Sequence, residues 1–237
     1  MKKALQLILS RKFQPWEGGE GKTVKQFLTA TMELAKLAIE NNKPQEALSL
    51  LNSSDNYPEN LGEGKLYNTP ENDIDYLKGV AFELLNDKNK AVEHYKRATQ
   101  GNDEPVQAIF YNDPQPDKIF YQGLAWIKLE DVARAQRIFN KLIAFGQEHI
   151  NDTISIDYFA VSLPDLLVFE SDLNKRNKIH CLYIMALGYL GLGEKYSDKA
   201  QSLFDEILEL DKNHQGAIVH KKMIKHIYTK TSASAKA

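Results

Sequence analysis

A triplet of small and apolar residues recurs three times in this chain at intervals of 44 residues. In each copy a small residue is followed twelve positions later by alanine, and four positions after that by a bulky apolar residue. The copies are Ala35, Ala47 and Leu51; Gly79, Ala91 and Tyr95; and Gly123, Ala135 and Phe139. Two antiparallel helices need this order of residues where their backbones touch. The sequence therefore predicts an all-α array of helix pairs.

The helix pairs are predicted near residues 23–53, 73–99, 117–148 and 178–210, with a closing amphipathic helix at 215–228. Thr23 is placed to cap the first helix, and Pro44 is placed at the start of the second, where its missing N–H is not needed. The fourth copy is offset, with Ala186 and Ala200 as its small residues. Residues 1–22 are read as an N-terminal extension with a glycine-rich loop, and 229–237 as a disordered tail.

Long inserts separate the helix pairs. They span residues 57–72, 101–116 and 151–177, and each contains proline, glycine or an apolar run. The third is so apolar that it is expected to pack on the array, with a short helix begun by Ser162 and Pro164. Ordered loops of this length often carry function because a rigid scaffold presents them.

Composition excludes several classes of protein. The net charge is −2 and the pI is near 6.3, so the chain has no electrostatic footprint for nucleic acid or anionic lipid. No stretch reaches the roughly 18 uncharged apolar residues of a membrane span, and no signal peptide is recognised. The single cysteine, Cys181, lies in an apolar stretch and is predicted to be a buried thiol. These features favour a cytoplasmic location.

The repeated triplet resembles the tetratricopeptide repeat (TPR), whose unit of roughly 34 residues has small residues at its eighth and twentieth positions. The motifs at 13–22, 57–62, 111–113 and 157–165, taken with the repeats, resemble the C-terminal TPR region of large bacterial proteins that carry a domain of unknown function. In that family the region follows β-sandwich domains similar to those of carbohydrate-active enzymes. The resemblance implies a TPR-like α–α superhelix with long inter-repeat inserts, as a fragment or a stand-alone accessory module. It transfers no catalytic residue.

The strongest candidate binding surface follows the repeat register. Three positions before the small residue, the first helices of the pairs carry Met32, Tyr76, Phe120 and Tyr183. In TPR arrays this position tends to face the concave groove, so these residues are expected to form an aromatic column that anchors a peptide or stacks on a sugar. The alternative, that they are core residues, stays open. Lys36 lies beside the column, and the TPR clamp for C-terminal carboxylates is absent because Val80, Leu124 and Leu187 follow it in register. Trp16, Tyr111 and Tyr158 are predicted to line the rim of the inserts.

The segment 18–23, Gly-Gly-Glu-Gly-Lys-Thr, resembles a phosphate-binding loop of the deviant Walker type. However, Trp16 and Glu17 stand where the two known patterns need glycine and lysine, and both patterns require a preceding strand of a parallel sheet. The similar segment 62–65, Gly-Glu-Gly-Lys, ends in Leu66. The motif is therefore interpreted as a structural turn, and ATP binding as an improbable third function.

The sequence offers no metal or catalytic motif. The six histidines form neither an HExxH pattern nor a close pair, and one cysteine cannot build a zinc cluster. We therefore expect no enzymatic activity, no cofactor and no metal. The predicted function is protein–protein interaction or scaffolding, with a peptide or partner domain bound in the concave groove. The alternative is an accessory module of a carbohydrate-processing protein that contacts an oligosaccharide or an attached catalytic domain.

Overall fold

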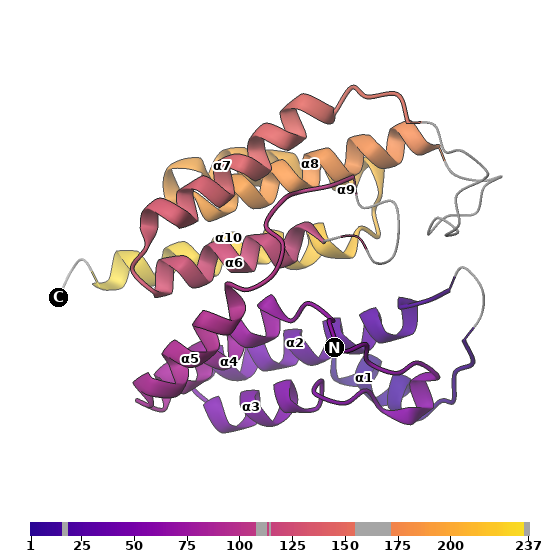
Figure 1. Ribbon diagram of the computed structural model, residues 1–237, viewed down its shortest axis with the longest axis vertical. Helices are drawn as coiled ribbons and strands as arrows, with labels where there is room; N and C mark the ends of the chain where they lie inside the picture. Colours follow the sequence, from indigo (N-terminus) through magenta and orange to yellow (C-terminus); the bar gives the residue numbers. More distant parts are fainter. Residues whose placement is uncertain (16–18, 108–112, 114, 155–171, 235–237) are drawn as a thin grey trace. The chain divides into compact units, whose positions relative to one another are not determined.

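The computed structural model describes all residues except 16–18, 108–112, 114, 155–171 and 235–237, and in the last helix it describes side chains only up to residue 224. All regular secondary structure in this described part is helical (Figure 1). The α-helices are α1 (Lys2–Leu9), α2 (Lys22–Glu40), α3 (Pro44–Asn52), α4 (Asn72–Leu84), α5 (Lys88–Ala98), α6 (Pro116–Lys128), α7 (Val132–His149), α8 (Leu173–Gly191), α9 (Ser197–Leu210) and α10 (Gln215–Ser234). Short 3₁₀ turns lie at Glu59–Leu61 and Glu194–Tyr196. The prediction of an all-α chain is confirmed.

The chain divides into two compact units. Unit 1 covers Met1–Gly101 among the described residues, and unit 2 covers the described residues from Asn102 onward. Unit 1 contains the helix pairs α2–α3 and α4–α5, and unit 2 contains α6–α7 and α8–α9 followed by α10. Each unit is described separately below.

The repeated triplet marks the place where the two helices of a pair meet. A Cβ atom added at Gly79 in α4 would overlap the Tyr95 ring in α5, and one added at Gly123 in α6 would overlap the Phe139 ring in α7. Ala35 and Leu51 belong to one core cluster in the first pair. The small residue is therefore required because a buried ring or leucine of the second helix rests against the first.

The turns inside the pairs repeat as closely as the helices do. Asn42, Asn86 and Glu130 each adopt a left-handed backbone conformation, with φ of 54°, 60° and 65°. The next residue in each turn closes a backbone hydrogen bond across the turn: Lys43 N to Ala38 O at 2.8 Å, Asp87 N to Phe82 O at 3.0 Å, and Asp131 N to Trp126 O at 2.9 Å. This is the Schellman motif, which satisfies the carbonyls at the end of a helix. Asp87 and Asp131 then cap α5 and α7 by accepting from Lys90 N and Arg134 N.

An aromatic–cation contact also recurs between the paired helices. Three positions after the small residue an aromatic ring lies under the basic residue that precedes the repeated alanine. The pairs are Phe82 with Lys90 at 5.3 Å, Trp126 with Arg134 at 4.5 Å, and Tyr189 with Lys199 at 4.4 Å from cation to ring centroid. Such contacts attract through the ring quadrupole and join the two helices in these three pairs. The apolar repeat pattern did not predict them.

The N-terminal extension contains a helix that was not predicted. In unit 1, Leu5 and Ile8 of α1 pack with Phe13 and Tyr57 against a core cluster of Val24, Phe27 and Leu61. The backbone N–H of Phe13 donates to Asn60 O at 2.8 Å, and the Asn60 amide donates to Ile8 O and Arg11 O at 2.9 and 2.7 Å. Gly62 has φ of 77° and lies so close to Phe13 that a side chain would meet its carbonyl oxygen. The first insert therefore holds the N-terminal segment in place.

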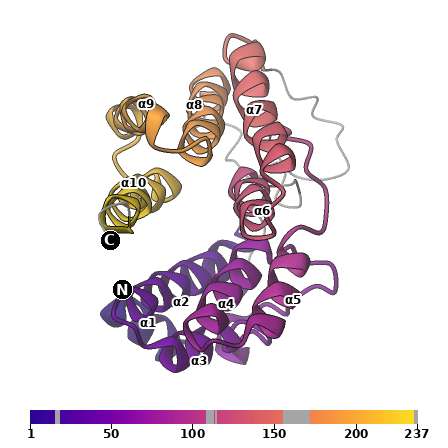
Figure 2. The ribbon, with the colours of Figure 1, turned by 90° about the vertical axis from the view of Figure 1, so that its left-hand side faces the viewer.

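In unit 2 the helices form two rows. Figure 2 shows α7, α8 and α9 side by side, with α6 and α10 in a second row next to them. Helix α10 continues to Ser234, so the prediction of a disordered tail from residue 229 is wrong for 229–234. The offset of the fourth copy coincides with the short 3₁₀ turn Glu194–Tyr196 between α8 and α9.

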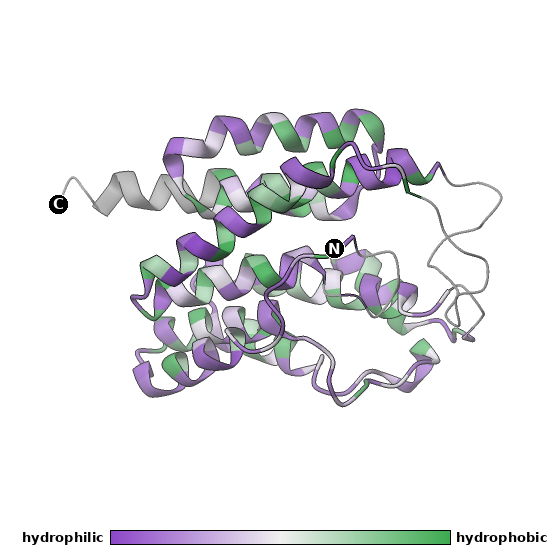
Figure 3. Ribbon diagram, turned by 45° about the horizontal axis from the view of Figure 1, so that its top comes forward, coloured by the Kyte–Doolittle hydropathy of each residue, from purple (hydrophilic) through white to green (hydrophobic). Residues whose placement is uncertain are grey.

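Most helices of the two units are amphipathic, whereas in α8 residues 181–190 are all buried. Figure 3 shows them striped with apolar and polar residues. Among the residues that the structure describes, no helix has the length and apolar character needed to cross a membrane. The short helix predicted to start at Ser162 lies outside the described residues.

Candidate functional site: the column positions and the inserts

The first two column residues lie at the edge of the core in unit 1. Met32 in α2 and Tyr76 in α4 are partly buried and pack against the cluster that contains Ala35, Leu51 and Ile74. The ring of Tyr76 also packs on Tyr95, with 5.9 Å between ring centroids. Both side chains therefore support the core and keep part of their surface accessible.

Lys36 lies one helical turn after Met32. Its Nζ atom pairs with Glu33 Oε1 at 3.0 Å, and the two side chains keep 17% and 12% of their surface exposed. An ion pair at this level of burial is screened less by solvent than a surface pair. The Lys36 ammonium group is thus fixed beside Met32 by a carboxylate of the same helix.

The other two column residues are buried in unit 2. Phe120 of α6 has no exposed surface, and Tyr183 of α8 keeps 7%. Both rings contact the imidazole of His220 in α10, with centroid distances of 5.6 and 5.9 Å. The expectation that Phe120 and Tyr183 face an open groove is therefore wrong, because α10 covers these positions.

A polar contact fixes α10 in this place. His220 Nδ1 lies 3.0 Å from the Tyr183 hydroxyl and 2.9 Å from Gly216 O. A Cβ atom at Gly216 would meet the Tyr183 hydroxyl at 2.5 Å, so glycine allows the approach. An ion pair between Lys221 and Asp205 joins the same helix to α9. This cluster of tyrosine and histidine is enclosed, so it acts as packing rather than as a reactive site.

The predicted rim residues Trp16, Tyr111 and Tyr158 lie outside the described residues. The described part of the first insert exposes two other large apolar residues, Leu66 at 68% and Tyr67 at 102%. They lie in a turn closed by Thr69, whose N–H and hydroxyl both donate to Leu66 O at 3.2 and 2.8 Å. In the sequence, Gly64 and Pro70 flank the two apolar residues, and this pattern could have indicated the turn.

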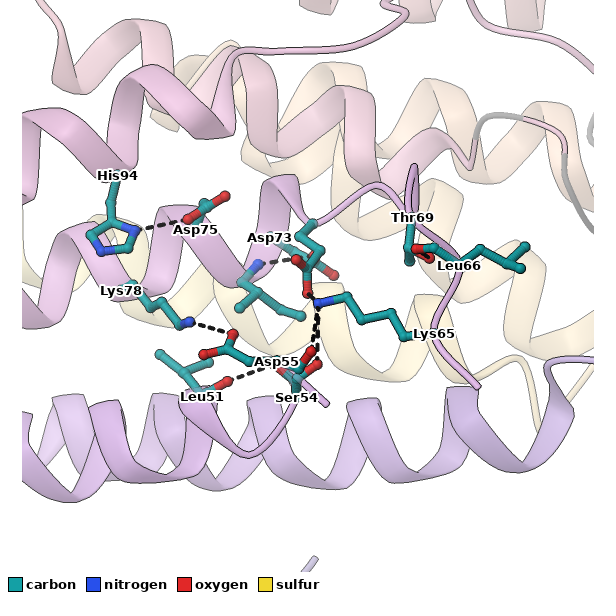
Figure 4. A network of polar contacts seen from close by, with 12 residues as sticks. Leu51, Ser54, Asp55, Lys65, Leu66, Thr69, Asp73, Asp75, Lys78 and His94 are labelled. Carbon is teal, nitrogen blue, oxygen red and sulfur yellow. Dashed lines mark hydrogen bonds and ion pairs between the residues drawn. The ribbon is translucent and has the colours of Figure 1, made fainter. Parts of the chain in front are cut away.

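Hydrogen bonds and ion pairs of two lysine side chains stabilise this turn (Figure 4). Lys65 Nζ donates to Glu71 Oε1 at 2.6 Å and to the carbonyl oxygens of Ser54 and Asp55 at 3.3 Å. Lys78 of α4, with 9% of its side chain exposed, pairs with Asp55 Oδ1 at 2.8 Å. The end of α3, the first insert and α4 are thereby tied together by two lysines.

Figure 4 also shows a polar contact between α4 and α5. His94 Nδ1 lies 2.8 Å from Asp75 Oδ1, and its ring stacks on Phe82 with a centroid distance of 5.3 Å and an interplanar angle of 12°. Asp73, which is almost fully buried, accepts from Ile74 N at 2.9 Å in the first turn of α4. A carboxylate at a helix N-terminus is favourable for the helix dipole, so these acids have a structural role.

The glycine-rich loop holds a carboxylate of the protein itself. Gly21 N, which precedes the first turn of α2, donates to Glu63 Oε2 at 2.7 Å. A phosphate bound by this loop would need that amide and would be repelled by the carboxylate. For the described residues 19–23 the geometry supports the interpretation of a structural turn, and Glu63 from the first insert completes it.

The single cysteine is buried. Burial raises the pKa of the Cys181 thiol to about 11, with a smaller contribution from Asp152, so the thiol stays protonated. Its predicted burial is confirmed. Within the described ranges, no group of three His, Cys, Asp or Glu residues is placed to hold a metal ion.

No protein-family model and no solved structure matches the chain.

Proposed function

We propose that this chain is a non-enzymatic TPR-like binding module, and that a peptide or partner domain binds the face of α2 and α4 formed by Met32, Lys36 and Tyr76. The supporting observation is the partial exposure of Met32 and Tyr76 beside the core, at repeat positions whose counterparts Phe120 and Tyr183 are covered by a helix. A partly exposed aromatic ring next to a rigid core is a favourable anchor because it offers a large contact area, and a methionine side chain adapts its shape to a partner.

Unit 2 suggests the form of the partner. There α10 lies on the column positions and contacts them with the imidazole of His220, while Lys221 on the same helix pairs with Asp205. By analogy, unit 1 accepts an amphipathic helix whose apolar side covers Met32 and Tyr76. Helix-in-groove recognition of this kind uses residues spaced by three and four positions.

The test compares three full-length baits in affinity capture with mass spectrometry. The baits are the wild-type chain, a Met32→Ala/Tyr76→Ala variant, and a control variant Val92→Ala, which truncates an exposed apolar residue of α5. Circular dichroism verifies that all three are equally helical. A segment of the captured protein is then synthesised and titrated against each bait.

We expect the synthetic segment to bind the wild type and the Val92→Ala variant equally and to bind the double variant at least about tenfold more weakly, as for the loss of an anchor residue. Equal capture and equal affinity for all three baits would reject this face as the binding site. If no protein is enriched by any bait, the adaptor function itself is contradicted.

The alternative is an accessory module that contacts an oligosaccharide. The observation in its favour is the turn at Leu66–Tyr67, which presents a fully exposed tyrosine ring of the type that stacks on sugars. Isothermal titration with glycans of the source cell tests it, with Tyr67→Ala as the loss variant and Leu66→Ala as its matched control. Absence of heat with the wild type would remove this function.

We also propose that the module works in a reducing compartment such as the cytoplasm. The support is its single cysteine, which is a buried thiol.

A further inference from the structure

The described part of the second insert is held down by side chains from three helices of unit 2. At one end, the amide of Gln122 in α6 donates to Asn102 O at 3.1 Å. At the other end, His180 Nε2 of α8 lies 2.7 Å from Val106 O and donates to it. We call residues 102–106 the strap. Its two ends are therefore fixed through backbone carbonyls, which every peptide possesses.

The middle of the strap forms ion pairs with a lysine of α7. Lys141 Nζ of α7 pairs with Asp103 Oδ1 at 3.1 Å and with Glu104 Oε1 at 2.6 Å. One ammonium group thus contacts two adjacent carboxylates. Pro105, which follows them, is buried. The three helices together recognise a backbone, an acidic pair and a proline.

The surface beneath the strap has the properties of a built peptide site. Gln122 keeps only 2% of its surface exposed, and its amide is directed at the strap carbonyl. His180 is partly buried and supplies a second directed donor. Preorganised donors of this kind lower the entropy cost of binding an irregular segment.

The strap itself has features of a segment that can leave. It has no regular secondary structure, and Gly101 just before it adopts φ of 102°, a conformation that glycine adopts without strain. The carboxylates of Asp103 and Glu104 keep 44% and 66% of their surface exposed. Ion pairs with that exposure contribute little to stability, so the middle of the strap is weakly held.

We propose that Gln122, Lys141 and His180 form a peptide-binding site that the strap occupies in the isolated chain, and that a partner segment with two adjacent acidic residues followed by proline replaces it. The site is separate from the α2–α4 face and does not depend on it. Because the strap is attached to the site, its effective concentration there is on the order of millimolar, and a free peptide competes poorly until the strap is weakened.

The experiment measures fluorescence anisotropy of a labelled synthetic peptide with the sequence of residues 101–107 as full-length protein is added. The strap is weakened by Asp103→Ala/Glu104→Ala in the protein. We expect this variant to bind the peptide about tenfold more tightly than the wild type does, as follows from the loss of two surface ion pairs in the competitor. A peptide carrying Asp103→Asn and Glu104→Gln is expected to bind the variant about tenfold more weakly than the unchanged peptide does.

Two further variants in the strap-weakened background identify the site. Lys141→Met is expected to weaken peptide binding about tenfold, as for the loss of both ion pairs. Lys178→Met, which removes a lysine of α8 that pairs with Glu206, is the matched control and is expected to leave binding unchanged. Addition of Met32→Ala/Tyr76→Ala is also expected to have no effect, which separates this proposal from the proposed function.

Three outcomes overturn the proposal. The first is the absence of peptide binding by the strap-weakened protein, and the second is equal binding after Lys141→Met. The third is unfolding of the strap-weakened protein in circular dichroism, because the strap would then be an inseparable part of the core.

Discussion

The first and second inserts occupy the same place in the repeat, yet they behave differently. The first insert projects Leu66 and Tyr67 into solvent from a turn that Lys65 braces. The described part of the second insert lies on the helices of unit 2, where Pro105 is buried. A shared repeat position therefore determines where an insert starts, while its own polar residues determine whether it projects or lies flat.

The two inserts differ because they contact different parts of the chain. The first insert contributes Leu61 to a core cluster and Glu63 to the start of α2, and its Asn60 binds the N-terminal segment. The second insert offers two carboxylates to Lys141 and two carbonyls to Gln122 and His180. The following predictions test what the two repeats share and where they differ.

The largest effect is expected in the helix packing that both repeats share. Gly79→Val and Gly123→Val place side-chain atoms against Tyr95 and Phe139, which are almost fully buried, so each is expected to lower the free energy of unfolding by about 3 kcal/mol. The Phe139 ring also lies against Gly191, so it has less room to move than Tyr95, and Gly123→Val is expected to cost more. Urea denaturation of the full chain measures this. Gly64→Val, where nothing lies within 4 Å, is the control, and equal stability of all four proteins would contradict the close packing.

The next effect distinguishes the inserts. Lys65→Met removes a hydrogen-bonded charge whose side chain is 19% exposed, and it leaves Glu71 without that partner, so a loss of about 1.5 to 3 kcal/mol is expected. Lys141→Met removes pairs that are more exposed, and a loss of about 0.2 to 1 kcal/mol is expected. Chemical denaturation of both variants under one set of conditions decides the order. A larger loss for Lys141→Met would show that the strap is held more firmly than the first insert.

A smaller, stabilising effect is expected in the turns. Glu130 adopts a left-handed conformation that costs a residue with a side chain more than it costs glycine, so Glu130→Gly is expected to raise stability by about 0.5 to 1 kcal/mol. Asn86 has the same conformation, but asparagine tolerates it better, so Asn86→Gly is expected to gain less. Thermal unfolding of the two variants compares them. Identical gains would mean that the side chains contribute equally to the two turns.

The smallest effect concerns pH. Burial lowers the pKa of His180 below its ordinary value of 6.5; Arg176 and His214 act in the same direction, while the Val106 carbonyl and Asp113 oppose it. Because the folded state binds the proton less readily than the unfolded state, the His180 contribution is complete above pH 6.5 and is lost as the pH falls below that value. We expect the stability of the wild type to fall more between pH 7.5 and 5.5 than that of His180→Gln, in which an amide replaces the imidazole. Parallel pH profiles for the two proteins would exclude this role of His180.

Much of the local structure was predictable because it depends on neighbours in the chain. The small residue, the alanine and the bulky residue fix two helices against each other, and this pattern predicted the contacts of Gly79 with Tyr95 and of Gly123 with Phe139. Pro44 begins α3 as predicted. The aromatic–cation pairs were present in the same register, as in Trp126 and Arg134, and were missed because only apolar positions were compared.

The candidate site was less predictable. The column was derived from register alone, which cannot say whether another helix covers a given position. Met32 and Tyr76 keep accessible surface, whereas Phe120 and Tyr183 do not. Helix α1 was also missed, because its eight residues have no capping side chain and its apolar side is explained only by the cluster around Leu61.

The sequence by itself determined the helix pairs, their turns and the buried state of Cys181, since these depend on residue spacing within a few tens of positions and on apolar burial. Only the tertiary structure decided that α10 fills the column positions in unit 2, that Glu63 occupies the glycine-rich loop, and that Lys141 holds the strap. These contacts join residues between 37 and 100 positions apart, as in Lys141 with Glu104 and Phe120 with His220. Such pairs leave no periodic signal in the sequence, because each depends on where the chain folds back and not on a repeated neighbour.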